Sequence, residues 1–119
     1  MENLIVTWNG ASGRPYDFSI FPIGTECIPY PGVYIFTRET SPGWWQALYV
    51  GESNSFHDRL YARLEDHDGY KRAARAGATH IGLHFTRASE RLWIETDLRH
   101  GLNPVCNKQS LATVIGGNR

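Results

Sequence analysis

Apolar residues recur along this chain in short runs that are typical of strands, several of them alternating with polar residues. Such β-rich runs occupy residues 4–8, 16–21, 33–38, 45–50 and 79–87. Turn residues separate the first two runs, and Ser41-Pro42-Gly43 separates the third from the fourth. Each of these pairs therefore predicts an antiparallel hairpin.

Three other segments have a helical pattern. Residues 55–67 place Phe56, Leu60 and Leu64 at four-residue steps, which predicts an amphipathic helix. A short basic helix is predicted over 70–77, and a further helix over 90–100. We therefore predict an α+β domain whose antiparallel three-stranded sheet is flanked by helices, with an N-terminal β-hairpin extension over 1–29 packed on the same domain. Residues 30–108 form the main domain and 109–119 a C-terminal tail.

The composition fits one globular domain. The chain has 119 residues, of which 41% are hydrophobic. It contains no apolar run near the roughly 20 residues that cross a bilayer, and its start lacks a signal-peptide pattern. We therefore expect a cytoplasmic protein without membrane contact. The two cysteines, Cys27 and Cys106, are too few for a disulfide scaffold, and buried thiols are favoured over a zinc site.

The net charge of zero hides an asymmetry. Residues 1–58 carry two basic and six acidic side chains, whereas residues 59–119 carry ten basic and six acidic ones. A bound polyanion would therefore approach the second half of the chain. Lys71, Arg72 and Arg75 are candidates for contact with a nucleic-acid backbone, although a solvated basic face is the simpler interpretation.

Several polar side chains fall at points where chemistry is plausible. Tyr34 and Tyr49 lie on the two predicted strands of the central hairpin, each within a glycine-containing tripeptide. The predicted helix over 55–67 carries Arg59, Arg63 and His67 at four-residue steps. Glu95 lies in an apolar helical stretch, where a carboxylate needs a partner or a metal ion. An ion pair of Glu95 with Arg91 or Arg99 is the competing interpretation.

These motifs together resemble the GIY-YIG nuclease family. The elements are Gly32-Val33-Tyr34, Tyr49-Val50-Gly51, an Arg-x3-His pair, Glu95, and Asn107 within "NPVCN". The spacing of twelve positions from Glu95 to Asn107 also matches the nuclease domain of the bacterial excision-repair endonuclease. The resemblance covers residues 30–108.

The resemblance implies a divalent-metal-dependent DNA endonuclease with one Mg²⁺ or Mn²⁺ ion per site, held by Glu95. It gives Tyr34 the role of general base or its helper, together with Tyr49, and it gives the arginine contact with the scissile phosphate. A phenol with a pKa of about 10 needs a cationic neighbourhood for that role. His67 would pass the proton onward. Gly32 and Gly51 would allow close backbone approach, and Asn107 would brace the strand ends.

Three points depart from the family pattern or stay open. Arg59 lies ten positions after Tyr49, as the family's arginine does, but Arg63 with His67 fits Arg-x3-His and is preferred. Glu52 follows the second glycine and would repel phosphate, and the gap between the two tripeptides is slightly long.

The alternative function is a non-catalytic nucleic-acid-binding module of the same fold. Branched or flap DNA, a homodimer and a separate targeting partner all remain open as partners.

Overall fold

The computed structural model describes residues 4–107. The segment predicted as a C-terminal tail, 109–119, therefore lies outside the described residues. The strands are β1 (Leu4–Asn9), β2 (Pro15–Pro22), β3 (Gly32–Ser41), β4 (Trp44–Ser53) and β5 (His80–Phe85). The helices and helical turns are η1 (Asp58–Ala62), η2 (Leu64–Asp66), α1 (Asp68–Arg75), α2 (Ala88–Leu102) and η3 (Val105–Asn107).

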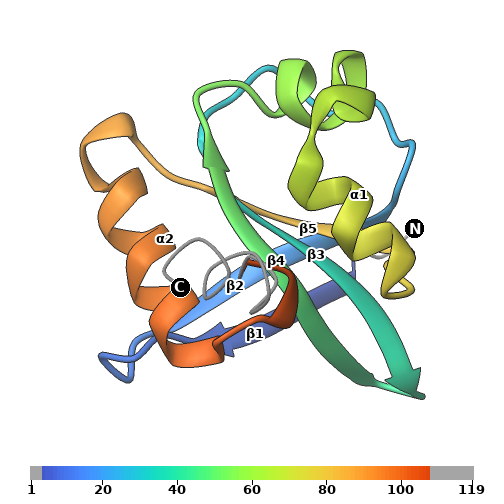
Figure 1. Cartoon of the computed structure of the whole chain (residues 1–119). Helices are drawn as coiled ribbons and strands as arrows, with labels where there is room; N and C mark the ends of the chain where they lie inside the picture. The colour runs from blue at the N-terminus through green and yellow to red at the C-terminus, as the bar shows by residue number, and fades with distance from the viewer. Residues whose placement is uncertain (1–3, 108–119) are drawn as a thin grey trace, which may run out of the picture.

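All five strands join one curled antiparallel sheet in the order β1-β2-β5-β3-β4 (Figure 1). The α+β class and the antiparallel pairing are confirmed. The prediction of a separate hairpin beside a three-stranded sheet is wrong, because β2 pairs with β5 from Ser19↔Leu83 to Pro22↔His80. Residues 4–22 are thus two strands of the same sheet.

Side chains of successive strand residues point to opposite faces, so the sheet has two faces to cover. One main helix covers each face. On β3, Tyr34 and Phe36 belong to the core beneath α1 and η1, whereas Val33 and Ile35 belong to the core beneath α2. In Figure 1 the two helices lie on either side of the edge strand β4. Side chains from both helices can therefore meet at this strand. Among residues 4–107, no helix combines the length and the apolarity that crossing a membrane requires.

The segment 55–67 is not the continuous α-helix that its apolar stripe predicts. The Arg63 amide bonds to the Asp58 carbonyl at 2.9 Å, which closes a wide π-type turn, and Arg63 itself leaves helical geometry with φ −124°. A tight turn over η2 follows, and His67 is extended at the start of α1. Phe56 and Leu60 are buried, so the stripe marks the core-facing side correctly but not the path of the backbone.

Asp97 fastens the turn between β1 and β2 to α2. Its buried carboxylate accepts hydrogen bonds from the Ser12 amide at 2.8 Å, the Ser12 hydroxyl at 2.7 Å and the Tyr16 hydroxyl at 2.8 Å. Gly10 passes so close that a Cβ there would lie 2.1 Å from the carboxylate. Burial acts to raise the pKa of Asp97, but the hydrogen bonds outweigh it and the pKa is lowered.

Candidate active site

The Tyr34 phenol is buried beneath α1, directly opposite Gly51 across the β3–β4 pair. A Cβ at Gly51 would lie 2.4 Å from the Tyr34 hydroxyl, so only glycine leaves room for the ring. Gly32 is restricted in the same way, because a Cβ there would meet the His84 carbonyl at 2.2 Å. Gly51 is therefore explained by close packing within the β3–β4 pair, and Gly32 by close packing against β5 and the Phe56 ring.

His67 holds the Tyr34 hydroxyl in one orientation. The hydroxyl oxygen lies 2.5 Å from Nε2 of His67, and the Tyr70 amide donates to Nδ1 at 3.2 Å. Because Nδ1 accepts a hydrogen bond, the proton of a neutral ring is on Nε2, which then donates to the phenol oxygen. His67 is fully buried at the N-terminus of α1, which fixes the ring in this position.

Tyr49 adds a second phenol to the same cluster. Its ring stacks on Tyr34 with centroids 6.3 Å apart, and it meets the His67 ring edge-on at 5.3 Å. Gly69 of α1 lies against the Tyr49 ring, since a Cβ there would be 2.5 Å from its Cε2. The first turn of α1 is thus shaped to receive both His67 and Tyr49. Gly69 and Tyr70 had no role in the sequence interpretation, which took them only for a helix interruption and its restart.

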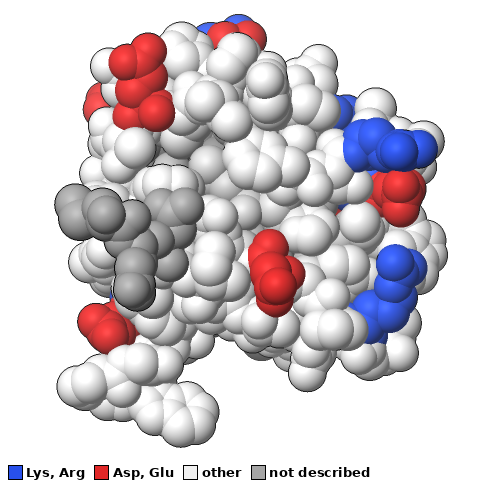
Figure 2. Space-filling model, turned by 180° about the vertical axis from the view of Figure 1, so that it is seen from behind, with Lys and Arg blue, Asp and Glu red and all other residues white. Residues whose placement is uncertain are grey.

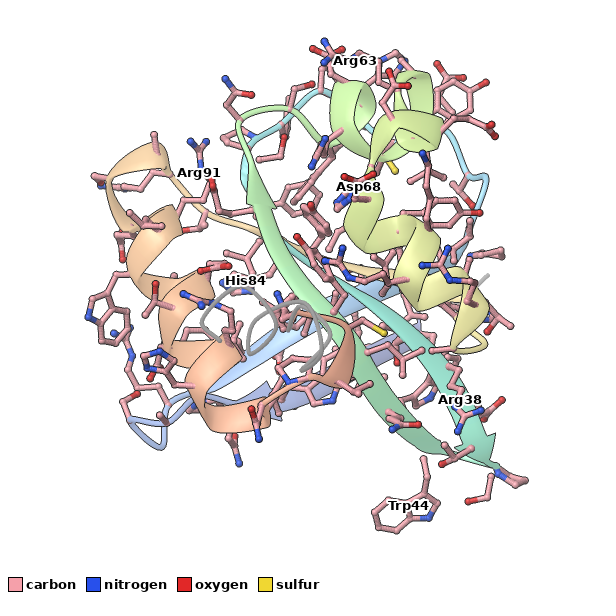
Figure 3. The ribbon with its side chains drawn as sticks, in the orientation of Figure 1. Arg38, Trp44, Arg63, Asp68, His84 and Arg91 are labelled. Carbon is pink, nitrogen blue, oxygen red and sulfur yellow. The ribbon has the colours of Figure 1, made fainter. Side chains whose placement is uncertain are left out.

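Arg59, and not Arg63, is the arginine that affects the pKa of the two phenols, Tyr34 and Tyr49. Burial and Tyr49 raise the pKa of Tyr34, and the nearby Arg59 guanidinium lowers it in part. Arg63 is exposed and points out from the end of the molecule (Figure 3). Arg59 and Arg63 still line one pocket beyond the end of β4, although the wide turn and the break at Arg63 end the regular helix between them.

Glu95 reaches the cluster from α2. Its side chain is only 13% exposed, and its Oε2 lies 3.4 Å from Nε of Arg99. The expected competing ion pair therefore exists, but it is not a solvent-exposed one. It is also loose, because Arg99 Nε is buried and makes no hydrogen bond among the described residues. The only hydrogen bond that Glu95 accepts within residues 4–107 is a long one, from the Thr96 hydroxyl at 3.4 Å.

The Tyr49 phenol is the point where charges from three elements converge. Burial raises its pKa most, and Glu95 raises it further, whereas the guanidinium groups of Arg59, Arg72 and Arg99 lower it. These groups come from η1, α1 and α2, on both sides of β4. The surroundings of this phenol therefore combine three cations with one carboxylate.

Glu52 does not stand as a free negative charge at the site. It pairs with Nε of Arg91 at 2.6 Å, and this ion pair joins the end of β4 to the start of α2 (Figure 3). Its charge still raises the pKa of Tyr34 and of Glu95 as a lesser contribution, behind burial in both cases. The predicted repulsion of phosphate is thus offset in part by Arg91.

Asn107 binds the free edge of β4. Its side-chain amide accepts from the Val50 amide and donates to the Val50 carbonyl, both at 2.7 Å. Arg72 in turn donates to the Cys106 carbonyl at 2.9 Å, which ties α1 to the same turn. The predicted strand contact of Asn107 is therefore present, and Val50 lies beside Tyr49. The effect of this brace on catalysis stays a prediction.

The three predicted backbone-binding cations occupy different surroundings. Arg72 is half-buried beside the phenols, as described above. Lys71 and Arg75 are exposed, and Lys71 lies 3.9 Å from Asp68. Seen from behind, the molecule carries scattered charges on a mostly uncharged surface, with no continuous basic patch on this face (Figure 2). Arg59, Arg72 and Arg99 are the cations that act on Tyr49 of β4.

Burial dominates the acid–base properties of the site. It raises the pKa of Tyr34 and of Glu95, and it lowers the pKa of His67 to about 4. The cationic neighbourhood expected to lower the pKa of Tyr34 is therefore too weak in the protein alone. His67 is uncharged at neutral pH, which agrees with the tautomer that its hydrogen bonds require.

A single divalent ion fits this donor set. Glu95 is a sheltered carboxylate with few hydrogen bonds and a raised pKa, so a cation beside it would relieve an unfavourable charge. Mg²⁺ and Mn²⁺ are commonly held by one or two carboxylates plus phosphate oxygens and water. Among residues 4–107 no group of three or more His, Cys, Asp or Glu side chains is arranged to hold a metal ion, so a closed zinc-type site has no support there.

Comparison of the chain with protein-family models, with curated proteins and with solved structures gives no match in any of the three. The functional interpretation therefore rests on the residues of this chain and their geometry.

Proposed function

We propose that the protein is a divalent-metal-dependent DNA endonuclease resembling the GIY-YIG family. The observation that carries this proposal is the buried Tyr34–His67 pair with the Tyr49 ring packed against both. Arg59, Arg72, Arg99 and the sheltered Glu95 are near enough to change the pKa of Tyr49. Arginines near the phenols together with a sheltered carboxylate suit a negatively charged substrate and a metal ion. Glu95, a largely buried acid with a raised pKa and one long hydrogen bond, is the kind of group that functional sites contain.

In the proposed reaction, water attacks phosphorus and one bridging P–O bond breaks, which leaves an alcohol and a phosphate monoester. Arg59 binds the non-bridging oxygens and stabilises their growing charge. Tyr34 acts in its phenolate form, whose oxygen accepts the Nε2–H of His67, orients the attacking water and takes its proton. The leaving oxygen takes a proton from solvent, and the Tyr34 phenol returns its proton to solvent. Glu95 would hold the metal ion, which would supply Lewis-acid activation of the phosphoryl group and a positive charge that favours the phenolate form of Tyr34.

The test is incubation of the protein with supercoiled plasmid and with branched and flap DNA, in Mg²⁺, in Mn²⁺ and in chelator. Metal-dependent cleavage that disappears in Glu95→Gln supports the proposal. Binding without cleavage in both metals would select the alternative of a non-catalytic nucleic-acid-binding module. Tyr34→Phe is the companion variant, because it keeps the buried ring and removes only the hydroxyl.

A further inference from the structure

A polar pocket that includes Arg59 opens beyond the end of β4. It has a volume of about 170 Å³ and is lined by Ser53, Asn54, Asp58, Arg59 and Arg63. A water molecule occupies about 30 Å³ in the liquid, so the pocket has room for a group of phosphate size. It lies in the turn between β4 and η1, at the end of the molecule where Arg63 projects in Figure 3.

Arg59 joins this pocket to the reacting groups. It lines the pocket and also acts on the Tyr34 phenol, so the two places share one guanidinium. A DNA strand with one phosphate at Tyr34 continues through further phosphates on each side. Because Arg59 is shared, a neighbouring phosphate of the same strand could enter the pocket while the first phosphate lies at Tyr34.

The pocket presents unused hydrogen-bond donors of the right kind. Arg63 forms neither an ion pair nor a side-chain hydrogen bond within residues 4–107, and neither does Asn54. The planar fork of an arginine matches two phosphate oxygens, and an amide adds a further donor. Asp58 is the one acidic group of the lining, and it lies 3.6 Å from His57, so Arg59 and Arg63 leave a net positive charge.

We propose that this pocket binds the non-bridging oxygens of a phosphate next to the one that is cut, with Arg63 as a substrate-binding residue rather than a catalytic one. The proposal rests on the nuclease function proposed above. It also gives the two arginines different tasks: Arg59 serves the reacting phosphate, and Arg63 fixes the register of the strand.

The test measures DNA binding in a Glu95→Gln background, by fluorescence anisotropy of a labelled branched duplex over a range of KCl concentrations. Arg63→Gln is expected to raise Kd roughly tenfold at low salt and to reduce the slope of log K against log salt by about one. Arg38→Gln is the matched control, because Arg38 is an exposed arginine on the remote β3–β4 hairpin and should change neither quantity (Figure 3). Asn54→Asp adds a negative charge to the pocket and should weaken binding in the same direction.

Cleavage kinetics separate this proposal from the function on which it rests. In an otherwise unchanged protein, Arg63→Gln should raise KM with little change in kcat, as expected for loss of uniform binding. If the protein cleaves DNA and Arg63→Gln behaves like Arg38→Gln, the pocket proposal is wrong and the nuclease function stands. If Arg63→Gln weakens binding by a protein that does not cleave, the nuclease function and the pocket's place beside a cut phosphate are both overturned, and Arg63 is a phosphate contact of the non-catalytic alternative. Absence of DNA binding would overturn both.

Discussion

Glu95 and Asp97 lie two residues apart on α2, yet their surroundings are opposite. Asp97 accepts three short hydrogen bonds from Ser12 and Tyr16, and its pKa is lowered. Glu95 accepts one long hydrogen bond and has a loose contact with Arg99, and its pKa is raised. A buried carboxylate with its full set of hydrogen bonds stabilises the fold, whereas a buried carboxylate that lacks hydrogen-bond donors is a candidate for function.

The backbone explains how one helix serves both purposes. Residues two apart point about 200° apart around an α-helix, so Asp97 faces the β1–β2 turn while Glu95 faces β4. The comparison predicts that changes at the two positions will have effects of opposite sign on stability and of very different size on activity.

The largest expected effect is that of Glu95→Gln. We expect a loss of at least about 10³-fold in cleavage rate, equivalent to about 4 kcal/mol, because the variant removes the proposed metal ligand. A raised pKa means that ionisation of Glu95 destabilises the folded state at neutral pH. The same variant should therefore gain stability, by about 1 kcal/mol. Cleavage assays and urea unfolding measure the two quantities, and a large loss of stability would contradict this view of Glu95.

Asp97→Ala should have the reverse effects of Glu95→Gln: a loss of stability with little change in activity. It leaves the Ser12 amide and the Tyr16 hydroxyl without their acceptor, which should cost about 3 kcal/mol of unfolding free energy. Cleavage per folded molecule should stay near the wild-type value, since the hydrogen bonds of Asp97 lie on the side of α2 that faces away from β4. Unfolding curves and activity normalised to the folded fraction provide the check. A specific loss of activity at full stability would end the distinction between the two acids.

The next effect is a stability change with pH that depends on His67. Its pKa falls from about 6.5 in the unfolded chain to about 4 in the folded protein, so the unfolded state binds the proton first. Stability should therefore be complete above pH 6.5 and fall by between about 2 and 3 kcal/mol as the pH drops to 4. Urea unfolding of the wild type and of His67→Gln across this range should show that the variant lacks this decline.

Asp97 provides the internal control for that experiment. Because its folded-state pKa is lowered, the stability it contributes is present above the unfolded pKa of about 3.9 and is lost as the pH falls through the folded value. The Asp97 contribution should thus disappear below the His67 window, and Asp97→Ala should keep the decline between pH 6.5 and 4.

The smallest expected effect is that of Gly51→Ala, which tests the packing of the site. The added methyl would overlap the Tyr34 hydroxyl and ring, so the phenol must shift away from His67. We expect a loss of about 2 kcal/mol from overpacking, together with reduced cleavage. Gly43→Ala at the hairpin turn is a contrasting variant, because Gly43 has open space around it and only a positive φ of 83°. It should lose stability through backbone strain while the folded fraction cleaves normally.

Much of the fold follows from the sequence, because strands with alternating apolar residues and glycine-containing turns are local features. The pairing of β2 with β5 is not local, and nothing in residues 16–21 indicates which strand they join. The apolar stripe of 55–67 predicted correctly which residues are buried. The same stripe fits both an α-helix and a wide turn followed by a tight one, so it did not predict the backbone conformation. That distinction decided the choice between Arg59 and Arg63.

The candidate site was predictable in its residue types rather than in its charges. Tyr34, Tyr49, His67 and Glu95 were found from motif spacing, and the structure brings all of them to the same region around β4. Asp97 carried the same signal as Glu95, an acid beside buried helix residues, and it was missed because its partner Ser12 lies 85 positions away. The pKa of Tyr34 was expected to fall and instead rises, since sequence alone does not reveal full burial.

The most direct test of the proposed site is a crystal of the protein soaked in Mn²⁺, examined by anomalous scattering. We predict one strong peak at the Glu95 carboxylate, on the side that faces Tyr49, and its loss in Glu95→Gln. A peak at Asp97 or at a remote surface carboxylate, with none at Glu95, would show that Glu95 is not the metal ligand.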